Sequence, residues 1–264
     1  MEFTDIVELK DVDGKKNRSN LIFKATMNGA RIILKASKGI KELDREIKIL
    51  RKLQICQFIP QLIQQDIGYG FINSQNSKSD KYYFMVTSPV GVPLNKIHSN
   101  DIVKYMTQIF QAVSFAHSNK VYHRDIKPAN IIVYDGTAVL IDWGMAVSFK
   151  NEWRFNFGMT AGYAASKYLK ASYSDKRDFE YQKAHDYESL KYTMIDIVDK
   201  FPLFNMEKSG VLPFIQERNQ LLLKHCEVWM KVESAVAVSK SKPDFYLQPV
   251  GHLNSKVIAG ISLP

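Results

Sequence analysis

The stretch HRDIKPANIIVYDGTAVLIDWG, residues 123–144, brings together four polar side chains that could do chemistry as a set. Asp125, Lys127 and Asn130 lie close together in the chain, and Asp142 follows after an apolar run with a turn inside it. Transfer of a phosphoryl group needs a metal on the nucleotide phosphates, a cation beside the transferred group and an acceptor for the hydroxyl proton. The stretch could be a working centre of this kind, the relic of one, or an ordinary hairpin with charged ends.

Each of the four side chains has a role that its chemistry allows. Asp125 can accept the proton of the attacking hydroxyl, and Lys127 can offset negative charge on the γ-phosphate. Asn130 can hold one Mg²⁺ by its side-chain carbonyl, and Asp142 can bridge the metals. The apolar run between them, folded around its turn, would fix the second aspartate against the first.

HRDIKPAN followed by DWG resembles the catalytic loop and the metal-binding loop of eukaryotic-type Ser/Thr protein kinases. A plain hairpin would have to reproduce both motifs at the right distance and in the right strand context. The resemblance implies an α+β, two-lobed fold with a small antiparallel sheet lobe and a helical lobe whose C-terminal part is shortened. It also implies ATP-dependent phosphorylation of Ser and Thr hydroxyls on protein substrates, with ATP and Mg²⁺ as cofactors.

The same resemblance assigns nucleotide-binding residues in the first third of the chain. Lys35 closes the strand RIILKA, where the kinase lysine contacts the α- and β-phosphates. Its expected ion-pair partner is Glu46 in REIKIL, with Glu42 one helical turn away as the fallback. FMVTSPVGVPL resembles the strand and hinge that bind the adenine edge, which places Thr87 at the gatekeeper position and Ser88 to Val90 in the hinge.

Four further residues are expected to support the catalytic loop. Asp186 in HDYESL resembles the buried aspartate that holds the backbone of this loop, and His123 is expected to pack and to form hydrogen bonds. Arg124 precedes the catalytic aspartate, and in many kinases that arginine meets a phosphate on the activation segment. Thr160 matches the threonine of the substrate-binding loop, placed to bond the catalytic aspartate and lysine.

Two regions of the chain depart from the family pattern. Where three glycines are expected above the phosphates, the chain has Lys15, Asn17 and Asn20, which predicts a weaker backbone cradle for the nucleotide. Lys167 stands where a glutamate normally ties the activation segment to an arginine near the end of the domain. That ion pair is therefore not expected here.

The activation segment offers Ser148 as its only hydroxyl side chain before Thr160, and Ser148 lies too near the metal loop to reach the usual phosphate pocket. We therefore expect a constitutively competent kinase that needs no loop phosphorylation. Trp153, Phe155 and Phe157 would order the segment instead by packing on the helical lobe.

Subfamily features point in two directions. YAASK, at 163–167, and DYESLKY resemble the casein kinase 1 group, whereas REIKIL and IDWG are more similar to casein kinase 2. Together with the net charge of +9, this favours substrates with acidic residues near the target Ser or Thr.

The elements that must position these residues follow from periodicity and turn signals. IVELK, NLIFKAT, ARIILKA and KYYFMVT read as strands, with Asn28 and Gly29 as a hairpin turn. Helical spacing appears over 40–53, after the connector over 101–120, and again over 184–201 and 211–238. The predicted domains are an N-lobe over 1–87, a hinge over 88–93 and a C-lobe with the C-terminal tail over 94–264.

Bulk properties add expectations about the setting. With two cysteines, Cys56 and Cys226, and neither a signal peptide nor a long apolar run in the sequence, we expect an intracellular protein of the cytoplasm or nucleus. We also expect a monomer that acts on protein substrates and needs neither a membrane nor a nucleic acid.

Three other functions compete with an active protein kinase. A pseudokinase scaffold that binds nucleotide or partners without turnover would have no physical need to keep six polar residues together. These six are Lys35, Glu46, Asp125, Lys127, Asn130 and Asp142. A small-molecule kinase of the aminoglycoside or choline type shares the Asp and Asn spacing but usually lacks the Arg-Asp-x-Lys-Pro form found here. A basic nucleic-acid-binding module has no support beyond the charge.

Overall fold

The computed structural model divides the chain into two compact units. The first comprises Met1–Gln54, Pro60–Val90 and Gln248–Pro264, and the second comprises Ile55–Ile59 and Gly91–Leu247. The structure describes residues 3–9, 20–64, 66–73, 79–97, 101–149, 159–174, 179–199, 210–240 and 261–263.

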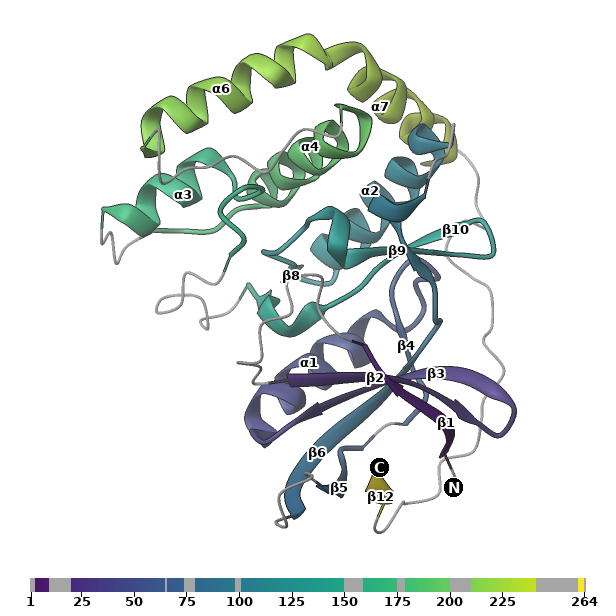
Figure 1. The fold of residues 1–264 in the computed structure, drawn as a ribbon. Helices are drawn as coiled ribbons and strands as arrows, with labels where there is room; N and C mark the ends of the chain where they lie inside the picture. The colour runs from purple at the N-terminus through teal and green to yellow at the C-terminus, as the bar shows by residue number, and fades with distance from the viewer. Residues whose placement is uncertain are drawn as a thin grey trace. The chain divides into compact units, whose positions relative to one another are not determined.

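The first unit is a sheet with one helix (Figure 1). Its elements are β1 (Phe3–Glu8), β2 (Asn20–Met27), β3 (Ala30–Ser37), α1 (Ile40–Leu53), β4 (Gln61–Leu62), β5 (Gly68–Asn73), β6 (Ser79–Ser88) and β12 (Ile261–Leu263). The strands run in the order β1-β2-β3-β6-β5-β12, and β4 pairs with β6. Every pairing is antiparallel except that of β12 with β5.

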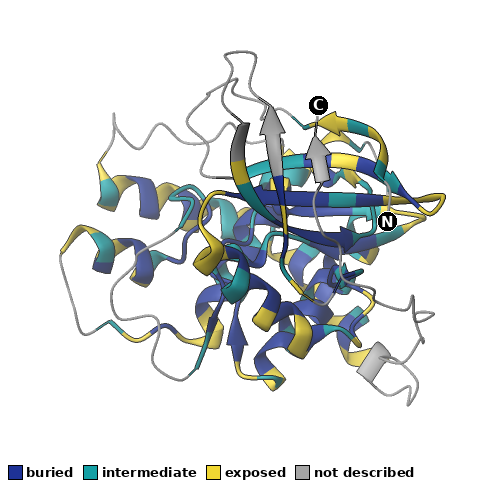
Figure 2. Cartoon of the chain, turned by 90° about the horizontal axis from the view of Figure 1, so that it is seen from below, coloured by how far each residue is buried: buried dark blue, intermediate teal, exposed yellow. Residues whose placement is uncertain are grey.

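Local chemistry explains the central hairpin of this sheet. The turn between β2 and β3 has positive φ angles at both Asn28 (51°) and Gly29 (79°), the combination that two-residue hairpin turns favour. Alternate residues of both strands face the core, where Phe23, Leu34 and Val86 are among the buried members of one apolar cluster. Buried residues gather along the strands and helices of each unit, and many exposed residues lie at turns (Figure 2).

Helix α1 packs one apolar face against β3, β4 and β6. Leu43, Ile47 and Leu50 are each 1% exposed, as their spacing of three and four residues predicts. Glu46 lies on this same buried face, at 3% exposure, whereas Glu42 is exposed. The helix therefore directs one carboxylate, not both, into the interior of the unit.

The second unit is mostly helical. Its helices are α2 (Ile102–Ser118), α3 (Ser166–Tyr173), α4 (Lys183–Asp199), α6 (Val211–Lys224) and α7 (Cys226–Lys240). Its short strands are β7 (Val92–Pro93), β8 (Val121–Tyr122), β9 (Ile131–Tyr134), β10 (Thr137–Leu140) and β11 (Val147–Ser148). In the part of this unit that the structure describes, single 3₁₀ turns occupy Leu94–Lys96, Pro128–Asn130 and Trp143–Met145.

Helix α4 packs against α2, α3, α6 and the 3₁₀ turn of Pro128–Asn130, so it supports the loop before β9. The β9–β10 hairpin turns at Asp135 and Gly136, again with both φ angles positive (47° and 68°). Gly91 allows the chain to pass close to β9, because a Cβ there would lie 2.7 Å from the carbonyl oxygen of Val133.

The structure also differs from the sequence-based expectations. β12 pairs with β5 in the first unit, whereas the C-terminal tail was predicted as part of the C-lobe. The single helix expected over 211–238 is broken at His225 into α6 and α7, and α3 and β5 were not anticipated. The predicted domain limits 1–87, 88–93 and 94–264 otherwise stay a prediction; the chain passes between units at Val90 and Gly91.

Candidate active site

In the first unit, Lys35 and Glu46 form a buried ion pair. Lys35 Nζ lies 2.7 Å from Glu46 Oε2, and the two side chains are 11% and 4% exposed. Strand β3 holds the lysine between its neighbours β2 and β6, and the buried face of α1 presents the glutamate. Because the ammonium group is fixed by a partner in the interior, its direction is set before any ligand binds. Glu42, the fallback partner, is not in this pair.

The proposed hinge residues follow β6. Thr87 is buried, pairs with Ile33 of β3 and lies opposite Leu62 of β4. Ser88 and Val90 are half-buried, and the Ser88–Pro89 peptide bond is cis. The position of these residues is thus fixed by strand pairing up to Ser88, while their role toward an adenine ring stays a prediction.

In the second unit, the Asp125 carboxylate is held on both oxygens. Oδ1 accepts hydrogen bonds from the Thr160 backbone N–H (3.1 Å) and from the Thr160 hydroxyl (2.7 Å). Oδ2 accepts from Lys127 Nζ (2.7 Å) and from Asn130 Nδ2 (3.0 Å). Lys127 Nζ also lies 2.8 Å from Thr160 Oγ1. The four polar residues therefore form one network that sets the direction of the carboxylate.

Asn130 is oriented so that its amide oxygen is left for a ligand. Its Nδ2 donates to both the backbone oxygen (2.8 Å) and the carboxylate of Asp125. The backbone carbonyl oxygen of Asn130, by contrast, accepts the backbone N–H of Ile141, the residue directly before Asp142, at 2.8 Å. An amide oxygen and a carboxylate are the hard oxygen donors that Mg²⁺ binds together with substrate phosphates, so this donor set fits the metal. Among the described residues no cluster of three or more His, Cys, Asp or Glu side chains could hold a metal by itself.

The residues around Asp142 are fixed by Trp143. Asp142 adopts a left-handed backbone (φ 61°) and begins the 3₁₀ turn of Trp143–Met145. The Trp143 indole N–H donates to the Leu140 carbonyl at 2.9 Å, and its ring meets the His123 ring edge-on at 4.6 Å. Trp143 is completely buried, so the start of this turn is anchored in the core.

His123 connects the two aspartate-bearing segments as a neutral imidazole. Its Nδ1 lies 3.3 Å from the Asp125 N–H, and its Nε2 lies 3.2 Å from the Ile141 carbonyl oxygen. These contacts require a proton on Nε2 and none on Nδ1. Burial lowers the pKa of His123, outweighing the opposing effect of nearby carboxylates such as Asp186. The neutral tautomer is thus the one that both contacts and burial favour.

Asp186, at the start of α4, holds the backbone of the catalytic loop. Its carboxylate accepts the backbone N–H groups of His123 (3.0 Å) and Arg124 (2.9 Å), and His117 Nε2 lies 2.9 Å away. Burial raises the pKa of Asp186, but the hydrogen bonds from His117 and the Arg124 backbone outweigh it, so its pKa lies below the usual value. A charged, fully buried carboxylate is thereby satisfied by several donors.

Arg218 of α6 anchors the segment that follows Thr160. Its Nη1 donates to the carbonyl oxygens of Ala161 (3.4 Å), Gly162 (3.0 Å) and Ala164 (2.8 Å). Its guanidinium carbon stacks 4.0 Å from the centre of the Tyr192 ring. The tie between this segment and a late arginine, not expected because of the residue at 167, is thus made through backbone carbonyls.

The sequence of this chain matches that of a known protein family. The sequence pattern described as "Protein kinase domain" matches residues 16–247. The chain belongs to the protein kinase family. The two-lobed α+β fold expected from the motifs is confirmed by this match, and members of the family use ATP and typically Mg²⁺.

Curated relatives are distant and longer. A mitogen-activated protein kinase kinase kinase 1a of Physcomitrium patens is 27% identical over 184 residues, 67% of this chain and 22% of the relative. A probable casein kinase II subunit alpha homolog of Encephalitozoon cuniculi is 24% identical over 197 residues, 72% of this chain and 58% of the relative. A probable serine/threonine-protein kinase of Dictyostelium discoideum is 28% identical over 186 residues, 68% of this chain and 29% of the relative. The chain thus spans less than two thirds of the length of each relative.

Sequence reasoning missed several residues that hold this kinase site together. Tyr168, Tyr181 and Arg218 were not singled out, although the odd residue at 167 was a sign that a late arginine needed another partner. Some predictions lie outside the described residues. These are the loop positions Lys15 and Asn17, the Asn20 side chain, and the aromatic set Trp153, Phe155 and Phe157.

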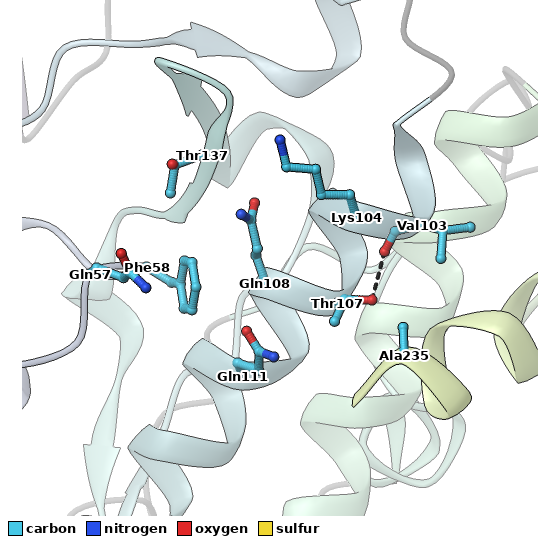
Figure 3. Close-up of a pocket in the computed structure, with 9 residues that line it drawn as sticks. All are labelled: Gln57, Phe58, Val103, Lys104, Thr107, Gln108, Gln111, Thr137 and Ala235. Atoms are coloured by element: carbon cyan, nitrogen blue, oxygen red, sulfur yellow. Dashed lines mark hydrogen bonds between the residues drawn. The ribbon is translucent and has the colours of Figure 1, made fainter. Parts of the chain in front are cut away.

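A separate cavity of about 510 Å³ lies in the second unit (Figure 3). It is lined by Gln57 and Phe58 on one side and by α2 side chains, including Lys104 and Gln108, on the other. Gln108 Oε1 accepts the Ala138 backbone N–H at 2.8 Å. No catalytic-loop residue that the structure describes lines this cavity.

None of the described helices has the length and apolar character needed to cross a membrane.

Proposed function

We propose that this protein kinase transfers the γ-phosphoryl group of ATP to Ser and Thr hydroxyls of protein substrates. The observation that carries the proposal is the Asp125 carboxylate, oriented at the same time by Thr160, Lys127 and Asn130. A carboxylate whose direction is fixed by donors on both oxygens is prepared to receive a proton from one defined position.

The residues divide the work of the transfer. Asp125 orients the substrate hydroxyl and accepts its proton, while Lys127, 2.7 Å from that carboxylate, offsets negative charge on the transferred group. Asn130 and Asp142 would hold Mg²⁺, which neutralises charge on the phosphate oxygens when bound. Lys35, held by Glu46, would contact the α- and β-phosphates, and the backbone of Ser88 to Val90 would bind the adenine edge.

Substrate preference and regulation belong to the same proposal. The net charge of +9 and the casein kinase 1 and 2 features favour acidic residues near the target hydroxyl. The likeness to casein kinase 2 is supported by one of the relatives, a probable casein kinase II subunit alpha homolog. We expect constitutive activity, because Ser148 lies in β11, paired with Val121, rather than in a loop that a second kinase could reach. We further propose a monomer acting inside the cell.

The main alternative is a pseudokinase that binds nucleotide or partners without turnover. The departures at Lys15, Asn17 and Asn20 favour weaker nucleotide binding, which agrees with a pseudokinase. Against it stands the complete polar set of Lys35, Glu46 and the catalytic loop, for which a scaffold has no chemical use.

The test is incubation of the purified chain with Mg²⁺ and labelled ATP, alone and with casein, histone or a basic protein, followed by identification of the phosphorylated amino acid. We expect label on Ser or Thr, with casein preferred and the preference fading as salt rises. Label on Tyr would contradict the Ser/Thr assignment, and nucleotide binding without any labelled protein would favour the pseudokinase.

A further inference from the structure

Arg124 directly precedes the catalytic Asp125, and the structure holds this arginine at both ends. It is 6% exposed, and its backbone is left-handed, with φ at 73°, a conformation that a residue with a long side chain rarely adopts unless its surroundings impose it. The backbone N–H donates to Asp186 Oδ1 at 2.9 Å. The guanidinium Nη2 donates to the Tyr168 hydroxyl at 2.6 Å.

Two aromatic rings lie beside the guanidinium group. Its central carbon lies 5.7 Å from the centre of the Tyr168 ring and 5.9 Å from that of Tyr181, within reach of cation–π attraction. The two rings meet edge-on at 5.0 Å. Each tyrosine is 3% exposed, and burial raises the pKa of both phenols, so both are neutral hydroxyl groups at ordinary pH.

Tyr181 joins this group to the carboxylate that supports the loop. Its hydroxyl donates to Asp186 Oδ1 at 2.8 Å, the same oxygen that accepts the Arg124 backbone N–H. Arg124, Tyr168, Tyr181 and Asp186 thus form a closed circuit of contacts, which we name the tyrosine circuit. Removal of the Tyr168 hydroxyl takes away the acceptor that the circuit supplies to Arg124 Nη2.

The elements that supply the circuit give it a position between two parts of the site. Tyr168 lies on α3, which begins at Ser166, shortly after Thr160 and the segment that Arg218 anchors. Arg124 lies in the catalytic loop. The Tyr168 hydroxyl therefore connects the segment that follows Thr160 with the residue before Asp125, in addition to the direct bond between Thr160 and Asp125.

We propose that Tyr168 is a positioning residue of this kinase, which holds Arg124, and through it Asp125, in the arrangement that phosphoryl transfer requires. The inference rests on the proposed function and deepens it. A neutral hydroxyl built into α3 occupies the guanidinium of Arg124, so the arrangement of the loop is part of the fold and does not await a modification of the chain.

The experiment compares Tyr168→Phe with wild type in transfer from ATP to casein. We expect kcat to fall about tenfold, because the variant leaves a buried guanidinium N–H without its acceptor, while KM for ATP changes less than about twofold. Tyr173→Phe is the matched control. It lies on the same helix but is 61% exposed, and it should keep full kcat.

A double-mutant cycle separates positioning from general support of the fold. If the hydroxyl acts through the arginine, Tyr168→Phe should cost little further kcat in an Arg124→Met background. Should Tyr168→Phe fail to fold, as checked by circular dichroism, Arg124→Met replaces it, since it removes the donor of the same bond and should lower kcat with little change in KM for ATP.

The positioning role would be overturned if Tyr168→Phe left kcat unchanged, or if it lowered kcat equally in the wild-type and Arg124→Met backgrounds. The proposed function would still stand in either case, because the wild-type protein is active. If the wild-type protein itself shows no turnover, the proposed function and this inference both fail. This result is seen without any variant, so it differs from the failure of the positioning role alone.

Discussion

Thr160 donates both its hydroxyl and its backbone N–H to the same oxygen of Asp125, at 2.7 and 3.1 Å. The segment that contains Thr160 and the loop that contains Asp125 are therefore joined at the carboxylate that we propose as the proton acceptor. Lys127, 2.8 Å from the Thr160 hydroxyl, shares this junction. A shift of the segment would change the direction of the carboxylate and of the lysine at once.

The Thr160 hydroxyl gives the first prediction. Thr160→Val keeps the volume of the side chain but removes the hydroxyl, and hydrogen bonds to charged groups are worth about 1.5–3 kcal/mol. We expect kcat to fall about 10- to 100-fold. Thr160→Ser retains the hydroxyl and should stay near wild type in the same steady-state assay. Equal activity of the Val and Ser variants would show that the hydroxyl does not orient Asp125.

Trp143 gives the second prediction. Trp143→Phe removes the indole N–H and leaves the buried Leu140 carbonyl without this donor, which should lower the free energy of unfolding by about 1–3 kcal/mol in urea denaturation. Activity should fall as well, because the turn that starts at Asp142 loses its anchor. Trp229→Phe is the control. Trp229 is also buried, but it bonds Glu233 within α7, so its loss should leave kcat unchanged.

Arg218 gives the third prediction. Arg218→Met removes the donor that serves three backbone carbonyls and should lower the free energy of unfolding by about 2 kcal/mol or more. KM for the protein substrate should rise more than KM for ATP, since the anchored segment follows Thr160.

Arg51→Met is the matched control for this loss of an arginine. The Arg51 side chain is 41% exposed and pairs with Asp66 at the surface, where an ion pair contributes little. The free energy of unfolding of the Arg51→Met variant should differ from that of wild type by less than about 0.5 kcal/mol. If both variants were equally stable, the three carbonyl contacts would have no energetic weight.

The buried histidines give the fourth prediction, on pH. Burial lowers the pKa of both His123 and His185 from the usual 6.5. On acidification the unfolded chain therefore takes up these protons before the folded chain does. The stabilisation is present above about pH 6.5 and is lost as pH falls from there through the folded-state pKa values. Urea denaturation from pH 7.5 to 5 should show this decline, and His123→Gln should reduce it. An unchanged slope in that variant would contradict the neutral, buried state of His123.

Short-range patterns carried much of the predictable structure. Asn28 and Gly29 predicted a hairpin because both can adopt positive φ, which the structure has. Glu46 could be preferred to Glu42 from motif likeness, and the buried face of α1 separates them. Asn130 lies so near the aspartate in the chain that one 3₁₀ turn suffices to join their side chains.

Long-range contacts were beyond the sequence. The bond between Arg124 and Tyr168 joins residues 44 apart, and those of Arg218 span 54 to 57 residues. Such pairs depend on how α3, α4 and α6 pack, and no local periodicity encodes that packing. The same holds for β12, a strand of three residues whose pairing with β5 no turn signal announces.

The central claim is that Asp142 and the catalytic loop transfer phosphate rather than only bind nucleotide. The most direct measurement compares wild type with Asp142→Asn for label transferred from ATP to casein in Mg²⁺, with nucleotide binding and folding measured on the same samples. We predict turnover by wild type and none by a folded Asp142→Asn protein, because an amide lacks the charge that holds the metal. Equal transfer by both proteins, or nucleotide binding without transfer by wild type, would contradict the account.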